Sequence, residues 1–177
     1  MYFKLTVLLF ASVTIETMIL FDFNAKSDIS DWLIVDDMVM GGQSNGSFEL
    51  NQEGHGVFSG QVSLENNGGF TSPRHRFKEK NVEGFTKAIL KIKGDGKAFQ
   101  FRLKSNAYDR HSYIGVFQTN GAWQTVEIAL TDMYPVFRGN KLNIPNYPIK
   151  VLEEIAFLIG NKKEERFLLE VDSIILE

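Results

Sequence analysis

The chain has 177 residues, of which 44% are hydrophobic and 23% charged, and its formal net charge at pH 7 is −3. This length suits a single domain whose core needs no covalent cross-link. The weak negative charge offers no basic field for nucleic acid, and the absence of cysteine excludes disulfides, thiol catalysis and thiolate metal sites.

Residues 1–17 leave three interpretations open. An uncharged apolar run from Leu5 to Val13 follows Lys4, in the outline of a short secretory signal, although no Ala-x-Ala cleavage site follows. Its β-branched residues also suit a buried first strand, and Met18 could be the true start. We expect residues 1–17 to be a signal peptide or an extra segment before one domain at 18–177, and the pattern favours an exported, periplasmic protein over a cytoplasmic one. The run is shorter than the roughly 20 apolar residues of a membrane-spanning helix.

From Met18 onward the sequence predicts short β-strands separated by turns. Aromatic and β-branched residues alternate with polar ones, and dipeptides such as Asn120-Gly121 mark hairpins. The expected strands lie within residues 18–23, 46–50, 55–66, 67–77, 85–93, 97–106, 113–119, 122–130, 155–159 and 167–176. Residues 131–137, TDMYPVF, are the best candidate for a single helical turn. Many short strands with hairpin turns predict an all-β protein, an antiparallel β-sandwich of the jelly-roll type.

Catalytic signals are weak. The chain has three histidines, and none lies in a recognised catalytic motif. His55 falls in a hairpin turn, and His75, between two arginines, is expected at an exposed strand position. His111, beside Tyr113, is the one histidine that we keep as a candidate pocket residue. We therefore expect a protein that is not an enzyme.

The segment DWLIVDDMVMGGQSNGSFEL at residues 31–50 places Asp36 and Asp37 before a Gly-Gly pair. Adjacent residues of an extended chain point to opposite faces, so the two acids cannot jointly flank a glycosidic bond. Aspartates before glycines commonly accept hydrogen bonds from loop N–H groups, which indicates a structural corner. A structural calcium ion is a further possibility, bound near Asp22 and Asp172 if the first and last strands pair.

Ligand binding has better support. Phe99, Phe101 and Leu103 occupy one face of the strand KAFQFRLKSN, while Gln100 and Arg102 occupy the other. If Tyr113 and Gln118 lie on neighbouring strands, that second face offers the parts of a carbohydrate or peptide groove. The alternative is a simply solvated face.

Two tryptophans and two methionines have competing roles. We expect Trp32 and Trp123 in the core rather than on a ligand platform, the latter because Val126 and Ile128 continue its strand. Met38 and Met40 could contact a partner, although methionine more commonly fills gaps in a core.

Five segments in this chain resemble the complex I intermediate-associated protein 30 family. They are DWLIVDDMVMGGQSNGSF, FSGQVSLENNGGFTSPR, WQTVEIAL, FRG and IAFLIGNKKEERFLLEVDSI, which occur in the family's order and cover nearly everything after Met18. The resemblance implies a jelly roll similar to galactose-binding-like domains and to certain carbohydrate-binding modules. It implies no catalytic residues, and a chaperone-like action through binding of assembly intermediates.

The family motif can be transferred residue by residue. The matching positions are Trp32, Asp36, Asp37, Met40, Gly41, Gly42, Ser44, Gly68, Gly69, Phe70, Ser72 and Arg74. We expect the glycine pairs to permit a tight backbone crossing, which Asp37, Ser44 and Ser72 satisfy with hydrogen bonds. Arg74 would present its guanidinium to a ligand or to a loop carboxylate.

The expected function is therefore non-enzymatic binding, with a protein partner such as an assembly intermediate or a membrane-complex subunit. The alternative is an exported module that binds a glycan. A mitochondrial member would carry an Arg- and Ser-rich leader, which MYFKLTVLLFASV is not, so we expect a bacterial or otherwise stand-alone version. The candidate binding residues are Arg74, Gln100, Arg102, His111, Tyr113 and Gln118.

Overall fold

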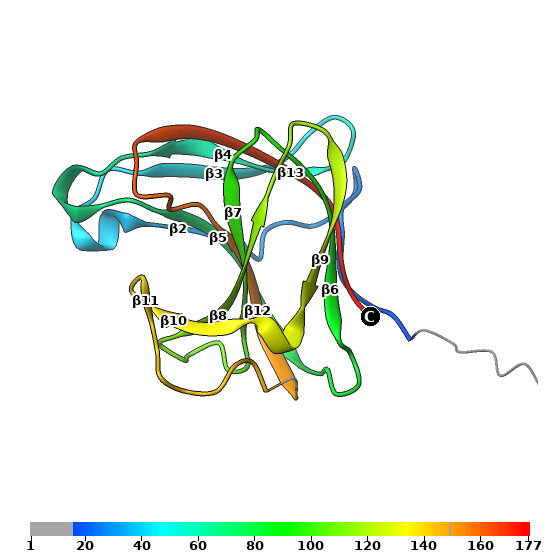
Figure 1. Cartoon of the computed structure of the whole chain (residues 1–177). Helices are drawn as coiled ribbons and strands as arrows, with labels where there is room; N and C mark the ends of the chain where they lie inside the picture. Colours follow the sequence, from blue (N-terminus) through cyan, green and yellow to red (C-terminus); the bar gives the residue numbers. More distant parts are fainter. Residues whose placement is uncertain (1–15, 149) are drawn as a thin grey trace, which may run out of the picture.

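The computed structural model describes residues 16–148 and 150–177, which form two antiparallel β-sheets packed face to face (Figure 1). The expected jelly-roll sandwich is confirmed. The proposed signal segment lies outside the described residues, apart from its last two positions. In the part of the chain that is described, no helix has the length and apolarity to cross a membrane.

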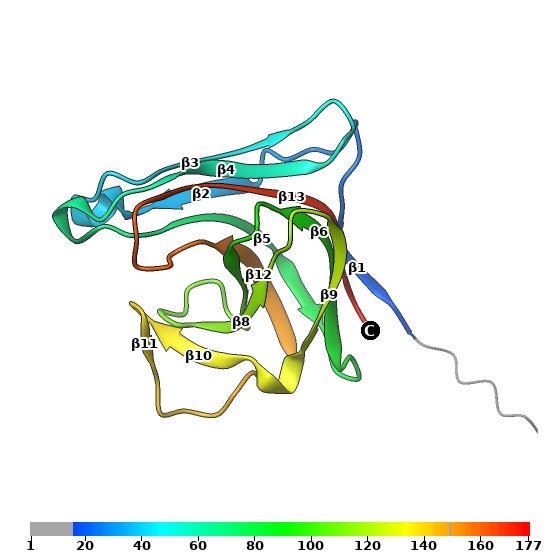
Figure 2. The same cartoon turned by 45° about the horizontal axis from the view of Figure 1, so that its top comes forward.

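One sheet has six strands and the other seven, and every pairing is antiparallel. The six-stranded sheet runs in the order β3 (Asn45–Leu50), β4 (Gly56–Val62), β13 (Glu165–Leu176), β6 (Lys87–Gly94) and β9 (Trp123–Ala129), and β1 (Met18–Asp22) pairs with β13. The seven-stranded sheet runs in the order β11 (Asn140–Lys141), β10 (Tyr134–Phe137), β8 (Ser112–Gln118), β7 (Ala98–Lys104), β12 (Val151–Leu158), β5 (Thr71–Asn81) and β2 (Trp32–Asp36). Figure 2 shows β1, in blue, beside the end of β13, in red.

Three 3-10 helices connect these strands: η1 (Asp37–Met40), η2 (Glu65–Asn67) and η3 (Leu130–Asp132). The helical turn predicted within residues 131–137 was misplaced. Its last four residues form strand β10, and the turn η3 begins earlier, at Leu130. Strand β2 was also not predicted, because its run WLIVD was interpreted as part of an irregular corner.

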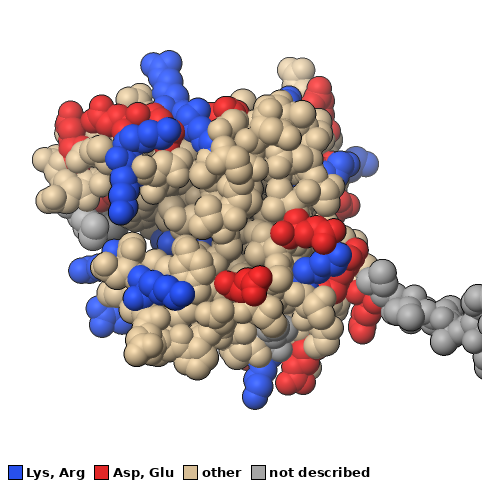
Figure 3. Space-filling view, viewed as in Figure 1, with Lys and Arg blue, Asp and Glu red and all other residues tan. Residues whose placement is uncertain are grey.

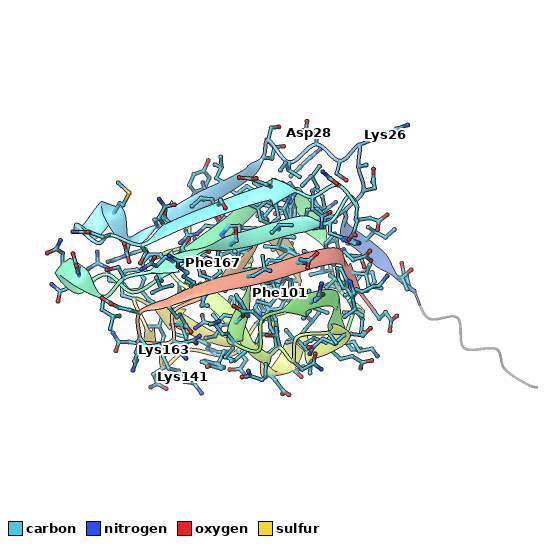
Figure 4. All side chains as sticks on the ribbon, turned by 90° about the horizontal axis from the view of Figure 1, so that it is seen from above. Lys26, Asp28, Phe101, Lys141, Lys163 and Phe167 are labelled. Carbon is cyan, nitrogen blue, oxygen red and sulfur yellow. The ribbon has the colours of Figure 1, made fainter. Side chains whose placement is uncertain are left out.

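Phenylalanine fills much of the space between the sheets. Phe101 of β7 and Phe167 of β13, labelled in Figure 4, lie between the two layers and belong to one buried cluster. Phe58 packs against Phe167 with ring centroids 4.6 Å apart, and Phe101 against Phe157 at 5.6 Å. The alternation predicted for β7 is confirmed, since Phe99, Phe101 and Leu103 are all buried. Gln100 and Arg102 therefore lie on the opposite, outer face of β7.

The two tryptophans have different environments. Trp32 is buried as expected, stacked on Phe48 at 4.7 Å and on the ring of His75 at 5.1 Å. His75 therefore packs against core aromatics rather than lying at an exposed strand position. The prediction for Trp123 was wrong, because its side chain is 38% exposed. Trp123 is an odd position of β9, whereas Val126 and Ile128 are even, so strand alternation turns it to the outer face.

The buried carboxylate of Asp37 organises the corner formed by the family motif. It accepts hydrogen bonds from the backbone N–H and the hydroxyl of Ser44, and from the N–H groups of Gly69 (2.6 Å) and Phe70 (3.2 Å). The Ser44 hydroxyl in turn accepts from the N–H of Ser63 at 3.0 Å. Burial by itself would raise the pKa of Asp37, but these hydrogen bonds together hold its pKa below the ordinary value.

Two glycines leave the space that this carboxylate occupies. A Cβ atom at Gly42 would lie 2.2 Å from an Asp37 oxygen, and one at Gly68 would lie 2.6 Å from the other oxygen. Gly41 and Gly69 beside them adopt positive φ angles of 88° and 134°. Each glycine pair therefore combines a position without room for a side chain with a position whose backbone favours glycine.

The remaining motif residues surround this corner. Asp36 accepts a hydrogen bond from the N–H of Gly46 at 3.3 Å, and the hydroxyl of Ser72 donates to the carbonyl of Phe157 at 2.6 Å, which ties β5 to β12. Met40 is the last residue of η1. Met38, in the same helix, is exposed rather than buried.

Replacing Asp37 with asparagine should destabilise the protein by about 3 kcal/mol at pH 7, because one amide oxygen cannot serve all four donors. Urea unfolding measures this loss. Asp132→Asn, at an exposed aspartate, is the matched control and should change the free energy of unfolding by less than about 0.5 kcal/mol.

The loss of stability caused by Asp37→Asn should be largest near neutral pH and smaller in acid. The pKa of Asp37 is lowered in the folded state, so its contribution is complete above the unfolded value near 3.8 and is lost as the pH falls through the folded pKa. The difference between wild type and variant should therefore shrink in acid. A difference that stays constant down to the acid unfolding limit would contradict this account.

Replacing Gly42 with alanine should cost about 2 to 3 kcal/mol, because the added methyl group collides with the Asp37 carboxylate. Gly121→Ala is the comparison, since Gly121 has a positive φ of 88° but open space around it. Only backbone strain of about 1 kcal/mol is expected there. Equal costs at the two glycines in chemical denaturation would show that the carboxylate is not the cause.

Candidate ligand-binding groove

A groove of about 670 Å³ lies on the outer face of the seven-stranded sheet. Strands β5, β7 and β12 contribute Arg74, Arg102, Gln100 and Leu158 to its lining. The rims come from the loop that follows η2, from the turn between β10 and β11, and from the loop between β12 and β13. Figure 3 shows Lys and Arg side chains around the hollow at the left of the molecule.

All charged residues that line the groove are cationic. The lining includes six cationic residues, Arg74, Arg102, Lys104, Arg110, Arg138 and Lys162, and no aspartate or glutamate. The whole chain has a formal net charge of −3, so the groove differs in sign from the protein average. A recess lined by charges of one sign attracts ligands of the opposite charge.

The strand register aligns the basic side chains in rows. Ala156 of β12 lies opposite Arg74 of β5 on one side and opposite Arg102 of β7 on the other. Two residues earlier, Glu154 lies between Arg76 and Lys104 in the same way. One row therefore has an acid between two bases, and the next row has an alanine.

The buried Glu154 compensates part of this charge. One of its oxygens lies 2.7 Å from the Nε of Arg76, and the other lies 3.8 Å from the Nζ of Lys104. The Lys104 ammonium also donates to the carbonyls of Ala107 and Asp109. Lys104 is therefore held by the protein, whereas the neighbouring row has no equivalent acid.

The pKa of Arg102 is lowered to about 10; burial is the largest cause, the charge of nearby Arg74 acts in the same direction, and the Glu154 carboxylate opposes both effects. The pKa of Arg74 is also lowered, mainly by burial, with Glu154 opposing and Arg76 adding to the shift. Both guanidinium groups stay charged at neutral pH. Their environment leaves positive charge only partly balanced.

Aromatic residues of the rims are tied to the protein in two ways. Phe70 directly follows Gly69, and the N–H groups of both residues donate to Asp37, so the motif corner fixes this rim. On the opposite rim, the guanidinium groups of Arg110 and Arg138 lie 4.6 and 5.4 Å from the ring centre of Phe137. These are cation–π distances.

The candidate binding residues divide into two groups. Arg74, Gln100 and Arg102 line the groove, and the Nε of Arg102 donates to the amide oxygen of Gln100 at 3.0 Å. Tyr113 does not share their face, because the register sets it opposite Leu103 and its side chain is in the core. This corrects the expected placement of Tyr113.

Gln118 and His111 lie outside the groove lining. The amide of Gln118 donates to the carbonyl of Gly96 at 2.7 Å, at the far end of β8. The ring of His111 meets the edge of Tyr113 at 5.1 Å, although its neighbours Arg110 and Ser112 line the groove.

Sequence reasoning did not propose several rim residues, namely Asn67, Arg110, Phe137, Arg138 and Lys162. They lie in loops or at strand ends, where no periodicity indicates a face. The segment FRG at 137–139 was the one available signal, through its match to the family.

The region proposed for calcium is a network of ion pairs. Strands β1 and β13 pair, which meets the condition stated for this site, and Asp22 lies opposite Ser173, whose hydroxyl lies 3.3 Å from the Asp172 carboxylate. Asp172 is also 3.2 Å from the Nζ of Lys91 and 3.5 Å from the Nε2 of His55. The Lys91 ammonium therefore already pairs with Asp172, and calcium binding stays a prediction.

Glu53, His55 and Glu170 lie beside this network, with one potential ligand atom from each within 4.8 Å of the others. The ammonium of Lys93 lies 3.0 Å from Glu170, however, so a protein cation is already present. His55 lies in the turn between β3 and β4. Its ring packs on Trp123 at 4.6 Å and lies near the carboxylates of Glu170 and Asp172, so it is not a simply solvated loop residue.

Solved structures with the same fold include carbohydrate-binding modules. The family 11 module of the cellulosomal cellulase Lic26A-Cel5E from Clostridium thermocellum is similar with a TM-score of 0.66 and 13% identity, over 93% of this chain and 95% of the module. The same kind of module in complex with a β-1,3-1,4-mixed-linked tetrasaccharide has a TM-score of 0.63 and 14% identity, over 93% and 96% of the two chains. At these identities the likeness shows the fold alone.

Sequence relatives include the mitochondrial complex I intermediate-associated protein 30 of Drosophila melanogaster, 25% identical over 92% of this chain and 63% of that protein. The protein of the same description from Mus musculus is 19% identical over 90% of this chain and 56% of its own length. The present chain thus spans only part of these relatives. Residues 21–171 match the complex I intermediate-associated protein 30 family, and this chain is a member of that family.

Proposed function

We propose that this protein is a non-enzymatic binding protein whose groove on the outer face of the seven-stranded sheet receives a segment of a protein partner. The observation that carries this proposal is the lining, which presents six cationic side chains and no carboxylate. A groove of about 670 Å³ is within the size range of ligand sites. The same lining contains neither a histidine nor an acid that would serve as a general base, which supports binding over catalysis.

The family suggests the kind of partner. The two relatives are described by their association with intermediates of complex I, and the present chain spans 63% and 56% of their lengths. By analogy, the proposed partner is an assembly intermediate or a subunit of a membrane complex. The positive charge of the groove lining favours a partner with an acidic surface segment.

A glycan is the second candidate ligand. The observation that favours it is the similarity over 93% of the chain to a module solved with a bound tetrasaccharide. Sugar rings pack on open aromatic faces, however, and Phe137 is approached by two guanidinium groups. This arrangement favours a charged ligand over a neutral glycan.

A photo-crosslinking amino acid, p-benzoylphenylalanine, tests the protein-partner proposal in the native cell. At Phe70 it keeps an aromatic side chain on the groove rim, and it should form a covalent adduct with a protein partner. The control position is Leu168, which is exposed on the other sheet and should give no adduct with the same partner. Mass spectrometry of the adducts identifies the partner and the contacting peptide. Adducts from Leu168 alone would contradict the proposed groove.

The glycan alternative makes a separate prediction that calorimetry can check. Mixed-linked β-glucan oligosaccharides should bind wild type with at most millimolar affinity if the groove prefers charged ligands. Micromolar binding that Phe70→Ala abolishes and Leu168→Ala preserves would favour the glycan as the ligand and would reject the protein partner as the main occupant.

A further inference from the structure

In the row Arg74–Ala156–Arg102, two groove arginines flank a residue that carries no charge, and Glu154 of the adjacent row balances their charge only in part. Residues directly opposite in a sheet have Cβ atoms about 5 Å apart, so the two arginines leave the sheet about 10 Å apart, with only a methyl group between them. Ala156 and Leu158 share the outward face of β12, because Ile155, Phe157 and Ile159 face the core. The space above Ala156 therefore lies between two long cationic side chains.

The adjacent row shows what such a space accepts. Glu154 occupies the same place between Arg76 and Lys104, and its two oxygens face one cation each. The protein thus supplies a carboxylate to one pair of bases and none to the next pair. Within the described part of the chain, no acidic side chain lies within ion-pair distance of Arg74 or Arg102.

The guanidinium of Arg102 is also positioned. Gln100, two residues earlier on β7, accepts a hydrogen bond from its Nε at 3.0 Å. This contact uses one of five donors and orients the rest. Burial and the charge of Arg74 oppose the protonated form of Arg102, and a bound anion would relieve both effects.

We propose that a carboxylate of the ligand binds above Ala156 and bridges Arg74 and Arg102, and that an aspartate or glutamate of an acidic segment of the protein partner supplies it. This inference rests on the proposed function and specifies its chemistry. Arginine pairs with carboxylates through two parallel hydrogen bonds, which gives geometric specificity.

The rims favour an acidic peptide segment over a single small anion. Arg110 and Arg138 stand at the β10–β11 side, and Lys162 stands on the loop between β12 and β13. Successive acidic side chains of an extended segment can therefore each meet a cation. Lys141, labelled in Figure 4, adds positive charge at the same end of the molecule, whereas the ammonium of Lys163 is paired with Glu165 at 3.2 Å.

Fluorescence anisotropy with a fluorescein-labelled hexaglutamate peptide tests the proposal, with labelled hexaglutamine as the uncharged probe. Wild type should bind hexaglutamate at low salt and should not bind hexaglutamine. Arg102→Gln should weaken binding at least tenfold. Arg166→Gln, which removes an exposed arginine from β13 on the other sheet, is the matched control and should change binding less than twofold.

Ala156→Glu provides an independent test. It places a carboxylate between Arg74 and Arg102, as Glu154 is placed in the adjacent row, so it should abolish binding of the peptide while the protein stays folded. Thermal unfolding of each variant verifies the fold, and Arg102→Gln gives a separate readout if the glutamate is not tolerated. Peptide binding that is unchanged in folded Ala156→Glu or in Arg102→Gln would overturn the carboxylate site.

Two further results separate this inference from the proposed function. If Phe70 still forms its adduct when Arg102→Gln is added and the adduct yield is unchanged, the protein partner stands and the carboxylate bridge is rejected. If oligogalacturonate binds and hexaglutamate does not, the acidic ligand is a glycan, and the proposed partner segment is rejected.

Discussion

The buried carboxylate of Asp37 connects segments that are distant in the sequence. Its four hydrogen bonds reach Ser44 in the chain leading to β3, and Gly69 and Phe70 in the chain leading to β5. A charged group in the interior is tolerated when such donors replace water. Because Gly69 and Phe70 also line the groove, the interaction that closes the corner also sets the position of one rim of the groove.

The sheet beneath that rim separates two kinds of surface by strand alternation. Its inner face carries aromatic and aliphatic residues, whereas its outer face carries Arg74 on β5 and Arg102 and Lys104 on β7, with β12 between these two strands. Glu154 balances only some of this charge. Like charges side by side are unfavourable without counter-charges, so their collection in one recess is more consistent with binding than with stability.

A jelly roll by itself does not distinguish between an assembly factor and a carbohydrate-binding module. The family match over residues 21–171 and the similarity to family 11 modules apply to the same β-sandwich. Function therefore has to be argued from the side chains on the scaffold. Here the lining has two phenylalanines and six cations, which suits an acidic ligand better than a neutral sugar.

Local patterns in the sequence determined most of the strands, the all-β class, and the division of β7 into a core face and an outer face, because strand alternation has a fixed period of two. The motif likewise indicated a corner in which the Asp37 carboxylate accepts hydrogen bonds from backbone N–H groups. Strand alternation would also have placed Trp123 correctly. Val126 and Ile128 are an odd number of residues away from Trp123 along β9, so they face the core while Trp123 faces outward. The partners across strands depended on register, which no local pattern contains: Tyr113 lies opposite Leu103 in the core, while Ala156 lies between Arg74 and Arg102. Only the tertiary structure decided that Ala156 lies between Arg74 and Arg102, because these residues are more than 50 positions apart along the chain and meet through the pairing of β12 with β5 and β7.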